Sequence, residues 1–127
     1  MGFLTGKTAI ITGAGRAVLK DGSCGIATAY AKEGANLVIT GRNVKKLEAA
    51  KQELESLYGI KVLTVQADVC AGGDNEATVA NVVKQAVDTF GGIQVLINNA
   101  QASASGVPLA EHTTEQFDLA IYSGLYA

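Results

Sequence analysis

A glycine-rich turn follows the first apolar segment of this chain, residues 9–11. Such a turn offers bare backbone to a pyrophosphate, and the unpaired N–H groups and dipole of a following helix favour an anion there. A plain tight turn would have the same composition, so this turn alone does not establish a nucleotide site. The residues of the turn that we expect to bind phosphate are Thr12, Gly13, Gly15 and Arg16.

A second apolar segment, residues 95–97, ends in two adjacent amide side chains and a small residue, Asn98, Asn99 and Ala100. Amides directly after a buried strand need hydrogen-bonding partners, which a bound nucleotide could supply. In parallel α/β sheets, ligands bind outside the carboxyl ends of the strands. The two turns together therefore predict a dinucleotide-binding sheet.

The turns after the two intervening strands indicate which dinucleotide it would be. In an NAD(H)-binding protein, an acidic residue after this strand accepts hydrogen bonds from both ribose hydroxyls. This chain has Gly41 and Arg42 there, and the Arg42 guanidinium instead suits a 2′-phosphate. This predicts NADP(H), although a surface arginine without a ligand would look the same. Asp68 and Val69 offer the adenine amino group a carboxylate and an apolar wall, and a helix-capping aspartate would also fit.

The elements that must position these turns alternate in their hydrophobic period. Segments rich in β-branched residues predict strands at 8–12, 36–40, 61–66 and 94–97. Segments with helical spacing predict helices at 25–33, 44–58 and 75–90, and a further helix that begins after Thr113 as N-cap. On the helix at 75–90, one apolar face is expected to comprise Val79, Val82, Val83, Ala86, Val87 and Phe90. Strands alternating with helices predict an α/β fold, a Rossmann-like doubly wound parallel sheet covered on both faces.

Length and composition limit the other possibilities. The 127 residues fit a single domain spanning 1–127, and the formal net charge of −2 argues against general affinity for nucleic acid. No apolar run approaches the ~20 residues of a membrane span, and the N-terminus does not resemble a signal peptide, so we expect a cytoplasmic location. Two isolated cysteines and one histidine predict no metal site.

The order of these turns resembles that of the short-chain dehydrogenase/reductase family. The resemblance covers nearly the whole chain, from the Thr-Gly-x-Gly turn through Gly-Arg and Asp-Val to Asn-Asn-Ala. Within the family, the segments at 58–63, 98–106 and 117–127 are most similar to bacterial 12α-hydroxysteroid dehydrogenases. The resemblance implies an NADP(H)-dependent oxidoreductase that acts on a secondary alcohol or ketone, such as the 12α-hydroxyl of a bile acid.

The resemblance also implies that this chain holds the N-terminal, cofactor-binding half of such an enzyme, with the sheet truncated after the fourth strand and its following helix. The family's catalytic Ser, and its Tyr with Lys four residues later, belong to the next strand and helix, and no Tyr of this chain has Lys at that distance. We therefore name no catalytic residue and expect the chain alone to be inactive. The helix after Thr113 belongs to the family's dimer surface, which implies a homo-oligomer.

Three positions depart from the family pattern. The third glycine of the phosphate loop is missing, and Ser23 falls at its place when the helix is aligned backward from Gly34, where its hydroxyl could still bind a phosphate. Gln101 replaces a glycine, and Gly124 stands where most members have the Asn of a proton relay. Two alternatives remain open: a nucleotide-binding module without turnover, and a relative of the divergent enoyl reductases, which lack Asn-Asn-Ala.

Overall fold

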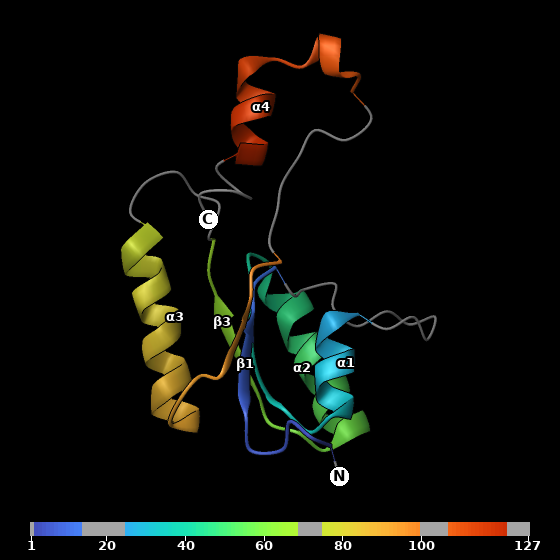
Figure 1. Cartoon of the computed structure of the whole chain (residues 1–127), viewed down its shortest axis with the longest axis vertical. Helices are drawn as coiled ribbons and strands as arrows, with labels where there is room; N and C mark the ends of the chain where they lie inside the picture. Colours follow the sequence, from blue (N-terminus) through green and yellow to red (C-terminus); the bar gives the residue numbers. More distant parts are fainter. Residues whose placement is uncertain (1, 14–24, 69–74, 100–106, 122–127) are drawn as a thin grey trace.

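The computed structural model describes residues 2–13, 25–68, 75–99 and 107–121, in which strands and helices alternate along the chain (Figure 1). The elements in chain order are β1 (Thr8–Ile11), α1 (Ile26–Lys32), β2 (Asn36–Gly41), α2 (Val44–Tyr58), β3 (Val62–Gln66), α3 (Asn75–Phe90), β4 (Val95–Ile97), the short 3₁₀ helix η2 (Leu109–Glu111) and α4 (Thr114–Ala120). The predicted elements are confirmed, with boundaries that differ by about one residue.

The four strands form one parallel sheet in the order β3-β2-β1-β4. β1 pairs with β2 from Thr8 opposite Asn36 onward, and on its other side it pairs with β4 from Ala9 opposite Val95 onward. The chain thus moves outward from β1 to β3 and then returns to the far side of β1. The strand order therefore reverses between β1 and β4, and parallel α/β sheets bind ligands at the carboxyl ends of the strands beside such a reversal.

Helices cover both faces of the sheet, as predicted. Figure 1 shows α1 and α2 on one side of the strands and α3 on the other. Because side chains alternate along a strand, Ile11 and Leu37 pack with the α1 and α2 side, whereas Ile10 and Val38 pack with the α3 side. The strands are therefore apolar on both faces, which explains why they read as continuous hydrophobic runs.

Helix α2 shows how local sequence signals set the boundaries of an element. The Asn43 side chain accepts a hydrogen bond from the backbone N–H of Lys46 at 3.2 Å and so caps the first turn. At the other end, Gly59 adopts the left-handed conformation with φ +67°, and its N–H donates to the Glu55 carbonyl at 3.0 Å. Between the caps, Leu47, Ala50 and Leu54 are buried against the sheet.

The expectation of one apolar face on α3 is only partly right. Val82 and Ala86 are buried against the sheet, whereas Val79, Val83 and Val87 are 44%, 40% and 43% exposed. The sheet below α3 contacts a narrower stripe of the helix than the sequence pattern suggested.

α4, the last described helix, lies beyond the sheet rather than on one of its faces. α4 begins with the predicted capping box, in which Thr113 and Gln116 bond each other's backbone N–H, and Figure 1 places it beyond the carboxyl ends of the strands. Phe117 of α4 and Leu96 of β4 are 56% and 58% exposed. None of the described helices combines the length and apolar character that crossing a bilayer requires.

Candidate functional site

The structure gathers the predicted site residues that it describes at one edge of the sheet. They follow the carboxyl ends of β1, β2, β3 and β4, and they are Thr12, Gly13, Arg42, Asp68, Asn98 and Asn99. Because all the strands run parallel, turns that are distant in the sequence become neighbours there. The other predicted site residues, Gly15, Arg16, Ser23, Val69 and Ala100, lie outside the described residues.

Hydrogen bonds join the turn after β1 to the turn after β4. The Thr12 backbone N–H donates to the Ile97 carbonyl at 3.1 Å, and the Thr12 hydroxyl oxygen accepts from the Asn99 backbone N–H at 3.0 Å. The Asn99 side-chain amide in turn donates to the Gly13 carbonyl at 3.4 Å. Thr12 and Asn99 therefore join the turn after β1 to the turn after β4, a structural role that was not predicted from the sequence.

Gly13 has a backbone conformation that explains its residue type. Its φ of +65° lies in the left-handed region, which a side chain at Cβ disfavours. The residue is exposed, directly after the hydrogen-bonded position Thr12. The chain thus leaves β1 through a turn whose backbone a ligand can approach without meeting a side chain.

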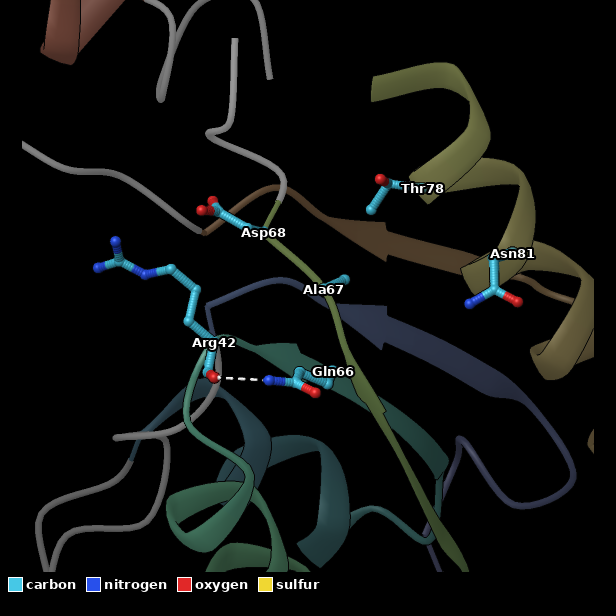
Figure 2. A pocket seen from close by; sticks show the side chains of 6 residues that line it. All are labelled: Arg42, Gln66, Ala67, Asp68, Thr78 and Asn81. Atoms are coloured by element: carbon cyan, nitrogen blue, oxygen red, sulfur yellow. Dashed lines mark hydrogen bonds between the residues drawn. The ribbon is translucent and has the colours of Figure 1, made fainter. Parts of the chain in front are cut away.

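A hollow of about 490 Å³ lies beside the carboxyl end of β3. Its lining residues are Arg42, Gln66, Ala67, Asp68, Thr78 and Asn81. Figure 2 shows the Arg42 guanidinium and the Asp68 carboxylate extending to the same side of β3, while Thr78 and Asn81 face β3 from α3. The hollow thus offers a cation, a carboxylate and neutral hydrogen-bonding groups to a polar ligand.

Positive charge collects where β2 leads into α2. Arg42 precedes the N-cap, Lys45 and Lys46 lie in the first turn, and that turn carries no acidic residue. The N-terminus of a helix is itself the positive end of its dipole, and acidic residues are the stabilising choice there. Three exposed cations at this position repel the dipole and one another, so the arrangement favours binding of an anion.

The polar residues of the hollow were only partly found from the sequence. Arg42 and Asp68 were predicted as site residues from the sequence. Gln66, Thr78 and Asn81 were not. Gln66 donates from Nε2 to the Arg42 backbone carbonyl at 3.3 Å (Figure 2). Gln66 is the last residue of a strand and directly precedes Ala67 and Asp68, and this position could have indicated that it belongs to the site. Thr78 and Asn81 share a helix face at i and i+3, but nothing in the sequence indicated that this face meets the end of β3.

The chemistry that this edge offers is recognition of a polar, anionic ligand. Arginine donates several hydrogen bonds to a phosphate, and carboxylates and amides select hydrogen-bonding groups on a base or a ribose. Among the described residues, no three His, Cys, Asp or Glu side chains come together as metal ligands would.

The family model described as short chain dehydrogenase matches residues 7–123. A 12alpha-hydroxysteroid dehydrogenase of Clostridium sp. is 60% identical over 127 residues, which are 100% of this chain and 48% of that protein. This chain therefore spans about half the length of that relative.

Solved structures with similar folds contain both forms of the nicotinamide cofactor. An L-sorbose reductase from Gluconobacter frateurii, complexed with NADPH and L-sorbose, has a TM-score of 0.74 and 32% identity over 97% of this chain and 43% of that one. An NAD⁺-bound xylitol dehydrogenase has a TM-score of 0.77 and 26% identity over 95% of this chain and 43% of that one.

The bond between Thr12 and Asn99 leads to a prediction on stability. Replacing Thr12 with Val keeps the shape of the side chain but removes the oxygen that accepts the Asn99 N–H. We expect the free energy of unfolding to fall by about 1 kcal/mol, measured by urea denaturation, and the Asn99 amide to exchange its hydrogen faster. Thr89→Val, at an exposed position of α3, is the control, and equal effects of the two variants would contradict the assigned role.

Proposed function

The chain belongs to the short chain dehydrogenase family, and on that premise we propose that it is the cofactor-binding half of an NADP(H)-dependent oxidoreductase. The observation that carries the choice of NADP(H) is the cluster of cations at the end of β2, where Arg42, Lys45 and Lys46 surround the N-terminus of α2. The similar solved structures bind nicotinamide dinucleotides, which supports the cofactor class.

The described residues fit the chemical groups of this cofactor. Arg42 would bind the 2′-phosphate, Asp68 would accept from the adenine amino group, and Thr12 and Gly13 would face the pyrophosphate. Asn98 and Asn99 would border the nucleotide at the end of β4. Gly15, Arg16, Ser23, Val69 and Ala100 stay predictions from the sequence. When bound, the nicotinamide ring supplies the chemistry of hydride transfer.

The preference for NADP(H) over NAD(H) follows from electrostatics. A 2′-phosphate adds negative charge at the ribose, where an acidic side chain would repel it and a guanidinium attracts it. No acidic residue stands at Gly41, Arg42 or Asn43. The uncharged ribose hydroxyls of NAD(H) are not attracted to these cations as strongly as a 2′-phosphate is.

The proposed substrate is a secondary alcohol or the corresponding ketone, and more narrowly a hydroxysteroid with a 12α-hydroxyl. The support is the 60% identity to a 12alpha-hydroxysteroid dehydrogenase, which extends over all 127 residues of this chain. A nucleotide-binding module without turnover is the second candidate, because no Tyr of this sequence is followed by Lys four residues later. The cytoplasmic location stays a prediction.

Arg42→Ala tests the cofactor assignment. We expect the Kd for NADPH to rise roughly tenfold or more, because a charge-assisted hydrogen bond contributes about 1.5–3 kcal/mol, and the Kd for NADH to change less than about twofold. Calorimetric titration of the purified chain measures both constants.

The control for this experiment is Lys61→Ala, which removes an exposed cation before β3, at the opposite end of the sheet. It should leave both dissociation constants unchanged. If the unmutated chain is folded and binds neither dinucleotide, or binds NADH as tightly as NADPH, the proposal is wrong.

A turnover assay tests the expectation that the 127-residue chain alone is inactive. Mixed with NADP⁺ and a 12α-hydroxysteroid, the 127-residue chain should bind the cofactor but form no NADPH, because it lacks the family's Tyr and Lys pair. The full-length Clostridium relative, assayed in parallel by NADPH fluorescence, shows that the conditions permit oxidation. Steady formation of NADPH by this chain would contradict the expected inactivity.

We also propose that the chain self-associates through α4. The support is the 56% exposure of Phe117 and the 43% exposure of Leu119, since exposed apolar side chains favour association. Light scattering of the purified chain should give a mass above that of the monomer, and Phe117→Lys should lower it. Leu57→Lys, at a similarly exposed position of α2, should not. A monomeric unmutated chain would refute this proposal.

A further inference from the structure

The backbone of Arg42 lies where the ladder between β2 and β3 stops. The last register pair of these strands is Gly41 opposite Gln66, and the Ala67 N–H donates to the Gly41 carbonyl at 3.0 Å. Two residues after Gly41, Asn43 caps α2 by accepting from the Lys46 N–H at 3.2 Å. Arg42 therefore occupies the single position between a strand that has ended and a helix that has not begun.

At that position the Gln66 side chain extends the contact between the two strands. Its Nε2 donates to the Arg42 carbonyl oxygen at 3.3 Å, beyond the last backbone bond of the ladder (Figure 2). A carbonyl fixed in this way fixes the Arg42 peptide plane, and the peptide plane sets the direction in which the side chain leaves the backbone. This bond therefore restrains the backbone from which the Arg42 side chain extends, and Figure 2 shows that side chain on the same side of β3 as the Asp68 carboxylate.

The residue type at 66 suits this task. An amide donates a hydrogen bond to a carbonyl and carries no charge. A glutamate of the same shape could not donate and would place a negative charge beside an anionic ligand, whereas a leucine could not bond at all. A glutamine at the end of the edge strand is therefore compatible with a phosphate in the same hollow.

We propose that Gln66 is a positioning residue that sets the selectivity for the 2′-phosphate by holding the turn that presents Arg42. This inference rests on the proposed function, since it assigns to Gln66 a part of the selectivity that Arg42 provides. Gln66 need not touch the cofactor. Its effect on binding passes through the backbone of Arg42, so it concerns the phosphorylated dinucleotide and not the parts that NADPH and NADH share.

The test compares Gln66→Leu with Gln52→Leu, which makes the same chemical change at an exposed position of α2. Calorimetry on the full 127-residue chain gives the Kd for NADPH and for NADH, and their ratio is the selectivity. Gln66→Leu should lower that ratio about threefold to tenfold, the range expected for one hydrogen bond, with the Kd for NADH changed less than about twofold. Gln52→Leu should keep the ratio of the unmutated chain.

The outcomes separate the two levels of the proposal. An unmutated chain without preference for NADPH refutes the proposed function itself. If the unmutated chain is selective and Gln66→Leu keeps its ratio, or weakens the binding of both dinucleotides equally, Gln66 has no positioning role and this inference is wrong.

Urea denaturation verifies that each variant is folded. Should Gln66→Leu not fold, Gln66→Met has a similar length with neither a donor nor a charge, and its ratio decides in the same way.

Discussion

The pairing of β1 with β4 is the constraint on which the rest of this structure depends. Because β4 returns to the far side of β1, the strand order reverses between β1 and β4, and this is the position at which parallel α/β sheets bind ligands. The Thr12 hydroxyl oxygen accepts from the Asn99 backbone N–H at 3.0 Å and so holds the turns after β1 and β4 together. Without that pairing, the turn after β4 would not lie beside the turn after β1.

The site combines features that oppose one another in the absence of a ligand. Arg42, Lys45 and Lys46 place positive charge at the positive end of a helix dipole, where stability alone would favour acidic residues. The side chains are exposed, so water and salt reduce the cost of this repulsion. A bound anion would relieve this repulsion.

Much of the fold followed from periodicity and caps. Thr113 was predicted as an N-cap from the sequence around it, and the structure confirms it. Asn43 and Gly59 end α2 by interactions that are just as local, although Asn43 was not predicted as a cap. The apolar face of α3 was harder. Its valines form two adjacent stripes, and only the position of the sheet decides that Val82 is buried while Val83 stays 40% exposed. Helical period alone cannot choose between such stripes.

The sequence by itself determined the composition of each turn, and with it the kind of ligand that the turns could bind. Glycine, arginine, aspartate and paired asparagines have their chemistry before the chain folds. Only the tertiary structure decided which turns meet and which side chains support them. Asn99 reaches Thr12 across 87 residues of chain, and Gln66 reaches Arg42 across 24. Contacts at such separations depend on strand order and register, which arise from the packing of the whole sheet rather than from any local run of residues.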